Sequence, residues 1–333
     1  MAGERIAVVG AGRMGRGIAQ SYALAGAEVL LVDLKERGIE DFEALTQGVL
    51  ADISADLEFA VEAGYLDANQ IGAILSRVLT VTGDSSAVDE SPISIAYEAL
   101  PETLELKRQA FDWVNERLSK QVVVASTTST LDVDELSAMV SNPQRFLNAH
   151  WLNPAHLMPL VEVAVGKTTT ESAYETVRDS LQAIGKVPVR CTASPGYIVP
   201  RIQALAMNEA ARLVEEGVAT AEDIDTAVRV GFGLRFAVLG LLEFIDWGGN
   251  DILYHASRHM SRTIDDARYA TPGIVEQNMK SGKNGLRERA GFYAYEDMDI
   301  EQYRRDRLGR FLDLVEYSGL LPAGLRRRKD QSR

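Results

Sequence analysis

Residues 5–15, RIAVVGAGRMG, decide the fold of this chain. The apolar run Ile6–Val9 has the composition of a buried strand, and three glycines follow it directly before a segment with helical spacing. A second strand pattern, EVLLVD at 28–33, ends in the acidic residue Asp33. A strand, a glycine turn, a helix and an acid at the end of the next strand together indicate a dinucleotide-binding unit.

Each glycine of this turn has a distinct physical reason. Gly10 permits the tight turn, Gly12 lets the backbone approach a pyrophosphate, and Gly15 lets the helix pack closely on the strand. The free N–H groups at the start of the helix favour phosphate, and a carboxylate at Asp33 favours ribose hydroxyls over a 2′-phosphate. The sequence therefore predicts NAD as the cofactor. The predicted cofactor-binding residues of this unit are Gly10, Ala11, Gly12, Arg13, Met14, Gly15 and Asp33.

Strand patterns and helical patterns alternate through the first half of the chain, which predicts a Rossmann-like, doubly wound α/β sheet. The segment 38–76 is too long for a simple crossover, and we expect it to be an inserted helical hairpin, at about 40–76, broken at Gly64. The further strands are expected at 77–82, 93–98, 122–126, 146–150, 160–163 and 187–190.

The pattern changes near residue 194 and is almost wholly helical from there on, for example at 198–216 and at 221–230, where Thr220 is a plausible N-cap. We therefore expect two domains: residues 1–193 as the NAD-binding Rossmann-like domain, and residues 194–333 as an all-α domain for substrate binding and dimerisation.

The composition limits the classes of partner. The net charge is −13, from 48 acidic and 35 basic residues, which argues against nucleic acid. The only basic run, 326–329, is expected to be a solvated terminus. A single cysteine, Cys191, and the lack of a long apolar run favour a cytoplasmic protein that neither spans nor binds a membrane.

Two polar residues in apolar surroundings are candidates for catalysis. His150 ends the stretch RFLNAH, and Glu162 lies within LMPLVEVAV, where a carboxylate needs a partner. If the two strands are neighbours, Glu162 orients the imidazole of His150 as a general base. The alternative is a structural histidine beside an unrelated ion pair. His255 and His259 are one helical turn apart, but no partner for a metal is evident nearby, so no metal is expected.

Several stretches together resemble the L-3-hydroxyacyl-CoA dehydrogenase family along nearly the whole chain. They are GAGRMGRGIA, YEALPE, ASTTSTL, AHWLNPAHLMPLVEV, TASPGYIVPRI, VEEGVATAEDIDTAV and AGFYAY. The resemblance implies a Rossmann-like domain with a helical insertion, followed by a helical domain that forms a homodimer.

The resemblance also implies roles for single residues. His150 corresponds to the catalytic base, Glu162 to its carboxylate partner, and Ser129 to the serine that binds the reacting oxygen of the substrate. Three further residues are assigned by it to the cofactor site: Asn153 near the nicotinamide, Glu98 in YEALPE, and Arg287 in place of a family lysine.

The chain departs from the family in ways that concern the substrate. Pro200 stands where the family has a substrate-positioning asparagine. The hairpin 38–76 contains no Lys or Arg and eight acids, although in the family it contributes to a coenzyme A site. The stretch GFGLRFAVLG, which contains Arg235, resembles the corresponding stretch in the family's branches that act on free hydroxy acids, such as L-gulonate and carnitine dehydrogenases. A guanidinium can bind a carboxylate through two hydrogen bonds. A surface arginine is the alternative.

From these observations we expect an NAD-dependent dehydrogenase that oxidises the 3-hydroxyl of a small 3-hydroxy acid to the 3-keto acid, with the free acid favoured over the thioester. A short-chain 3-hydroxyacyl-CoA (3-hydroxybutyryl-CoA) dehydrogenase is the first alternative. A non-catalytic, NAD-binding structural protein is the second, because the family includes a lens protein.

Overall fold

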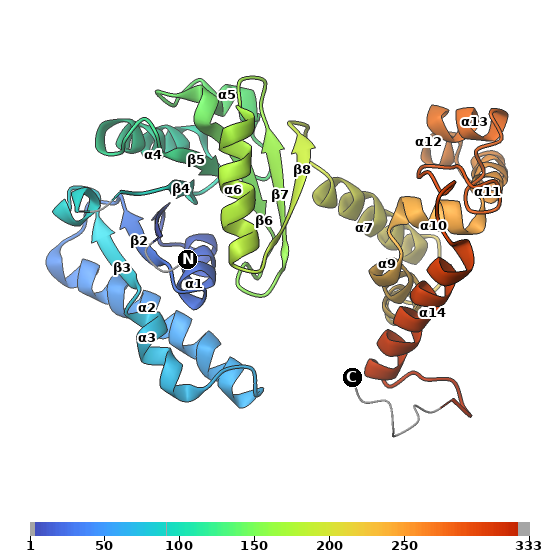
Figure 1. Ribbon diagram of the computed structural model, residues 1–333, viewed down its shortest axis with the longest axis horizontal. Helices are drawn as coiled ribbons and strands as arrows, with labels where there is room; N and C mark the ends of the chain where they lie inside the picture. Colours follow the sequence, from blue (N-terminus) through green and yellow to red (C-terminus); the bar gives the residue numbers. More distant parts are fainter. Residues whose placement is uncertain (1–3, 91, 326–333) are drawn as a thin grey trace. The chain divides into compact units, whose positions relative to one another are not determined.

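The computed structural model describes residues 4–90 and 92–325, so the basic run 326–329 lies outside the described residues. The chain divides into two compact units, one ending at Met207 and the other beginning at Asn208 (Figure 1). This division falls within a helix, and the expected domain boundary between residues 193 and 194 stays a prediction.

An eight-stranded sheet forms the centre of the first unit, in the order β3-β2-β1-β4-β5-β6-β7-β8. The expected strands are confirmed, and the change of direction in strand order lies between β1 and β4. The strands are β1 (Arg5–Val9), β2 (Glu28–Asp33), β3 (Val78–Thr82), β4 (Ile95–Glu98), β5 (Val123–Ser126), β6 (Phe146–Trp151), β7 (Leu160–Val165) and β8 (Val187–Thr192).

The sheet is parallel except at one pair: β7 runs antiparallel to β6. The loop 152–159 is the physical reason, because a parallel return needs a crossover of about a dozen residues or more. The antiparallel pairing places His150 directly opposite Glu162 in the register.

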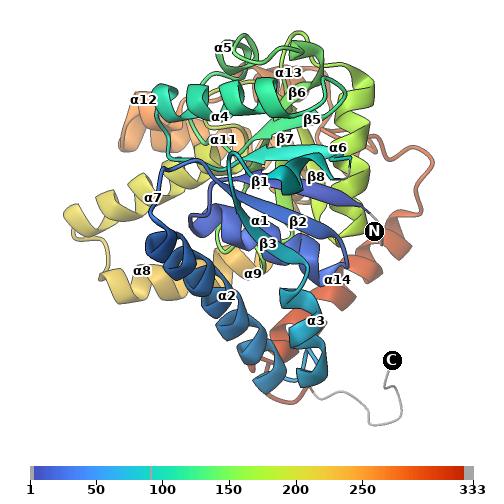
Figure 2. The same cartoon turned by 90° about the vertical axis from the view of Figure 1, so that its left-hand side faces the viewer.

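Helices cover both faces of the sheet, as a doubly wound fold requires, and Figure 2 shows α1 and α4 on opposite sides of β1. One hydrophobic core forms beneath α1, α2 and α6, and a second beneath α4 and α5. These helices are α1 (Arg13–Leu24), α2 (Ile39–Glu62), α4 (Leu104–Arg117), α5 (Val133–Ser137) and α6 (Glu171–Ala183).

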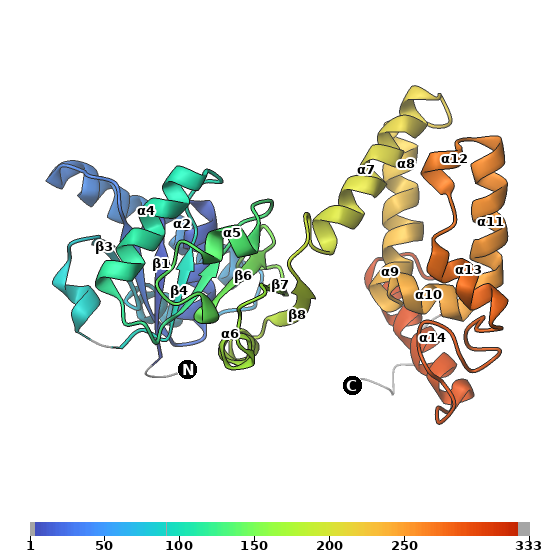
Figure 3. The ribbon, with the colours of Figure 1, turned by 90° about the horizontal axis from the view of Figure 1, so that it is seen from above.

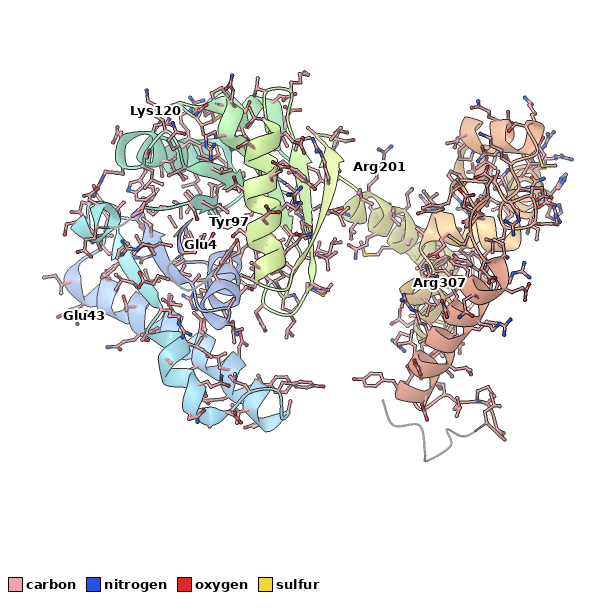
Figure 4. The ribbon with its side chains drawn as sticks, viewed as in Figure 1. Glu4, Glu43, Tyr97, Lys120, Arg201 and Arg307 are labelled. Carbon is pink, nitrogen blue, oxygen red and sulfur yellow. The ribbon has the colours of Figure 1, made fainter. Side chains whose placement is uncertain are left out.

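The expected insertion is confirmed as α2 followed by α3 (Ile71–Leu75), with the chain reversing after Gly64 in the left-handed region, at φ +79°. One side of α2 packs on the core through Val49, Ile53 and Leu57. The acids near its start, Glu40, Asp41 and Glu43, are exposed, and Glu43 is labelled in Figure 4.

Helix α7 (Val199–Glu215) leads from the first unit into the second, which is helical as expected (Figure 3). Thr220 caps α8 as predicted, since its side chain accepts from the amide of Asp223. The remaining elements are α8 (Ala221–Ala227), the π-helical η4 (Val228–Gly233), α9 (Leu234–Val238), α10 (Leu241–Gly248), α11 (Asn250–Thr263), α12 (Asp266–Tyr269), α13 (Gly273–Lys280) and α14 (Ile300–Tyr317). Among the described residues, no helix is long and apolar enough to cross a membrane.

Candidate active site

The glycine turn is as tight as the sequence predicts. Gly10 has φ +116°, and a Cβ there would lie 2.9 Å from the carbonyl oxygen of Ala99. A Cβ at Gly15 would lie 1.9 Å from the carbonyl oxygen of Gly10, so any side chain would push α1 away from β1. Gly12 caps α1 without a side chain, which leaves the first-turn amides for a ligand. The backbone therefore fits a pyrophosphate.

A cavity of about 920 Å³ opens in front of this turn, at the carboxyl ends of the parallel strands. That position is where open α/β sheets bind their ligands. The cavity brings together the predicted residues Gly10, Ala11, Gly12, Arg13, Met14, Asp33, Ser129 and Asn153.

Asp33 lies where the ribose of a dinucleotide would reach, at the end of β2 and on the wall of this cavity. Its carboxylate accepts from Arg37 Nε at 2.5 Å. Arg37 is a cation that could otherwise bind a 2′-phosphate, and Asp33 holds it in an ion pair. The arrangement favours a cofactor without that phosphate.

The expected pair of His150 and Glu162 forms across β6 and β7. His150 Nδ1 lies 2.8 Å from Glu162 Oε2, and neither side chain is more than 7% exposed. The other carboxylate oxygen, Oε1, accepts from the amides of Ile198 at 3.0 Å and Val199 at 2.7 Å. These amides belong to the N-terminus of α7, where a negative charge is stabilised. Glu162 is therefore a fully bonded carboxylate with a fixed orientation.

This network assigns the tautomer of the imidazole. A carboxylate accepts, so Nδ1 of His150 donates to Glu162, and Nε2 keeps a lone pair that can take a proton. The ring of Tyr197 lies beside the imidazole, with the centroids 5.4 Å apart. The hydroxyl of Tyr197 donates to the carbonyl of Thr128 at 3.2 Å, so one side chain connects His150 to the loop that carries Ser129.

The site contains two further residues, Glu102 and Lys107, that no sequence pattern marks individually. Glu102 ends the stretch YEALPE, and Lys107 lies in the first half of α4. Glu102 accepts from the loop after β5, and Lys107 Nζ lies 2.9 Å from a carboxylate oxygen of the fully buried Glu98. Partial burial opposes ionisation of Glu102, but the hydrogen bonds from Thr128 and Thr130 and the charge of Lys107 hold its pKa below the usual value.

One other predicted residue of the first unit, Glu98, does not line the cavity. Glu98 is buried beneath it, accepting also from Leu100 N at 2.7 Å and Ser126 Oγ at 2.7 Å, so its role in cofactor binding stays a prediction. Arg235 and Arg287 belong to the second unit. The guanidinium of Arg235 lies 4.9 Å from the centroid of Phe244, and Arg287 pairs with Asp251 and Glu288.

Pro200 is the second residue of α7. An amide at that position has no acceptor within its own helix, so proline costs the helix no backbone hydrogen bond. The departure from the family pattern therefore concerns the missing amide side chain and leaves the local fold intact.

A second cavity, of about 710 Å³, lies between α1, α2 and the loop after β6. Its wall includes two acids of α2, Asp52 and Asp56. Asp52 pairs with Arg16, and Asp56 Oδ2 lies 3.5 Å from His156 Nδ1. One cation of this cavity, Arg16, is therefore already matched by an acid of the hairpin.

Comparison with known proteins gives a consistent result. Residues 5–194 match the model of the 3-hydroxyacyl-CoA dehydrogenase NAD-binding domain, and residues 196–295 match that of the 3-hydroxyacyl-CoA dehydrogenase C-terminal domain.

The relatives differ in their substrates. The chain is 30% identical over 294 residues to the 5-formyl-3-hydroxy-2-methylpyridine 4-carboxylate 5-dehydrogenase of Mesorhizobium japonicum, covering 88% of this chain and 91% of the relative. It is 34% identical over 291 residues to the 3-hydroxyadipyl-CoA dehydrogenase of Escherichia coli, covering 87% of this chain and 58% of the relative. A solved 3-hydroxyacyl-CoA dehydrogenase of Archaeoglobus fulgidus superposes with a TM-score of 0.75 at 28% identity, covering 95% of this chain and 99% of that one.

Proposed function

Because this chain belongs to the 3-hydroxyacyl-CoA dehydrogenase family, whose members are NAD-dependent oxidoreductases acting on CH–OH groups, we propose that it oxidises the 3-hydroxyl of a small 3-hydroxy acid reversibly to the 3-keto acid. The observation that carries this proposal is the His150–Glu162 pair, at the same edge of the sheet as the dinucleotide cavity.

NAD, when bound, supplies the acceptor for the hydride that leaves C3 of the substrate. The residues of this chain then handle the proton. Nε2 of His150 takes it from the 3-hydroxyl, and Glu162 stabilises the imidazolium that forms. The hydroxyl of Ser129 donates to the reacting oxygen and keeps it aligned with His150. In the reverse direction, the imidazolium returns the proton as the keto group is reduced.

The free acid is the favoured substrate on electrostatic grounds. Coenzyme A carries several phosphate charges, and the hairpin 38–76 offers eight acids and no Lys or Arg to receive them. Asp52 also pairs with Arg16, a cation of the neighbouring cavity. The relative from Mesorhizobium is named for a pyridine carboxylate, which supports this preference. Arg235 is our candidate for binding the carboxylate.

The second candidate is a short-chain 3-hydroxyacyl-CoA dehydrogenase. The relative from Escherichia coli, named for 3-hydroxyadipyl-CoA, favours it, although this chain covers only 58% of that protein.

Steady-state oxidation of NADH with acetoacetate and with acetoacetyl-CoA separates the two candidates, and a panel of other free 3-keto acids extends the test. We expect the highest kcat/KM with a free acid. A kcat/KM for acetoacetyl-CoA at least tenfold above that of every free acid would overturn the preference and establish the second candidate. The homodimer, which the family resemblance implies, and the cytoplasmic location, which the single cysteine favours, are also proposals.

A further inference from the structure

The loop 127–131 after β5 carries Ser129, and each of its five backbone amides already has an acceptor. The two central amides both donate to Glu102 Oε1, at 2.9 Å. The amide of Thr127 donates to the carbonyl of Glu98 at 2.9 Å. The amide of Thr128 donates to Ser126 Oγ at 3.3 Å, and that of Leu131 donates to Thr128 Oγ1 at 3.0 Å. The loop therefore has no free amide with which to bind a substrate oxygen.

One carboxylate oxygen organises the centre of this loop. Besides the two amides, Glu102 Oε1 accepts from the hydroxyl of Thr130 at 3.0 Å and from that of Thr128. Hydrogen bonds to a charged acceptor are about twice as strong as neutral ones. Four such bonds over three consecutive residues fix the backbone on both sides of the Ser129 side chain.

Glu102 is itself held in place from the opposite side. Lys107 Nζ lies 3.6 Å from Glu102 Oε2, and the ammonium is fully buried against Glu98. The carbonyl of Leu100 accepts from the same ammonium at 3.0 Å. The start of α4 and the end of β4 thus form a rigid support under the loop that follows β5.

We propose that Glu102 is a positioning residue, which consumes the amides of Ser129 and Thr130 so that Ser129 reaches the reacting oxygen through its hydroxyl and not through the backbone. The side chains of Ser129 and His150 then bind the reacting oxygen, and no backbone oxyanion hole takes part. This inference rests on the proposed function for the role of Ser129.

Amide hydrogen exchange tests the geometry without any substrate. Glu102→Met removes the acceptor and keeps the bulk, whereas Glu102→Gln keeps an acceptor and removes the charge. We expect the Met variant to raise the exchange rates of the Ser129 and Thr130 amides at least tenfold, and the Gln variant to raise them less. The matched control is Glu105→Ala, an exposed acid on the first turn of α4. Unchanged rates in the Met variant would overturn the proposal.

A double-mutant cycle then tests whether Glu102 acts through Ser129. The probe is NADH oxidation with acetoacetate or acetoacetyl-CoA, whichever the wild type reduces faster. We expect Glu102→Met to lower kcat by up to about 100-fold, the cost of misplacing a reacting group by about 1 Å, with the Kd for NADH unchanged and with activity largely restored in Glu102→Gln. In a Ser129→Ala background, the same change should have little further effect.

The outcomes separate the two proposals. If Ser129→Ala alone keeps normal kcat, the role given to Ser129 in the proposed function is wrong, while the exchange data still decide the geometry. If Ser129→Ala lowers kcat but the effects of the two substitutions multiply, Glu102 does not act through Ser129 and this inference fails. If Glu102→Met does not fold, Thr130→Val replaces it in the same comparison with Ser129→Ala, because it removes the hydroxyl of Thr130 that donates to Glu102.

Discussion

His150 combines a fixed orientation with a free basic nitrogen, because Glu162 binds only Nδ1. General-base catalysis of this kind contributes about 10²- to 10⁴-fold to a rate. We therefore expect His150→Gln to lower kcat by that order, while the Kd for NADH, measured by fluorescence titration, stays within about twofold. His259→Gln, on the exposed side of α11, is the control and should leave kcat unchanged. Near-normal turnover of His150→Gln would exclude His150 as the base.

We expect Asp33 to determine which dinucleotide fits, partly through its ion pair with Arg37. Removal of the carboxylate frees a guanidinium that Asp33 now holds at 2.5 Å, and a free guanidinium is a good ligand for a 2′-phosphate. Asp33→Ala should raise kcat/KM with NADP relative to NAD by at least tenfold. The double variant Asp33→Ala with Arg37→Ala should lose most of that gain. An unchanged ratio would mean that this strand end does not contact the ribose.

At the scale of elements, the loop between β6 and β7 depends on a buried lysine. Lys186 is 7% exposed, and its ammonium donates to the carbonyls of Ala155 at 2.7 Å and Met158 at 2.9 Å, with Trp151 beside it. Burial lowers the pKa of Lys186. The loop that it holds carries Asn153, a wall residue of both cavities.

Replacing this lysine by an apolar residue leaves its carbonyl partners unsatisfied. Lys186→Met should lower the free energy of unfolding by about 1–3 kcal/mol, the cost of a buried unpaired polar group, in urea titration. The KM for NADH should rise more than kcat falls, because the family resemblance assigns Asn153 to the cofactor site. Lys120→Met, at the surface in Figure 4, is the control. Wild-type stability and KM in Lys186→Met would show that the loop holds its shape without the lysine.

The α2–α3 hairpin shows why charge and shape have to be considered together. Its helical pattern predicts the insertion, and its acids predict the sign of the local charge. Only the packed structure shows that Asp52 and Asp56 turn back onto Arg16 and His156, so that Asp52 neutralises a cation near the cofactor cavity.

At the scale of the whole molecule, the net charge of −13 opposes the approach of a highly charged substrate. Salt screens this repulsion over about 8–10 Å at about 0.1–0.15 M. With saturating NADH, raising the ionic strength from about 20 to about 200 mM should increase kcat/KM several-fold for acetoacetyl-CoA and much less for acetoacetate. A decrease for the thioester would instead indicate a cationic coenzyme A site and would contradict the electrostatic argument.

The sequence by itself determines the nucleotide-binding unit, the order of strands and helices, the inserted hairpin and the NAD cofactor. These features depend on local periodicity and on glycines whose conformation only glycine adopts readily, and such signals are contained in short stretches such as 5–15. The family pattern also indicates His150, Glu162 and Ser129 as candidate catalytic residues.

The tertiary structure alone decided how those residues meet. The antiparallel turn of β7 sets His150 opposite Glu162, the N-terminus of α7 binds the second oxygen of that carboxylate, and Glu102 reaches across to the amides of the Ser129 loop. These contacts join residues that are 12, 37 and 27 positions apart, and none leaves a periodic trace in the sequence. Long-range hydrogen bonds depend on strand direction and on packing, and only the folded chain fixes these.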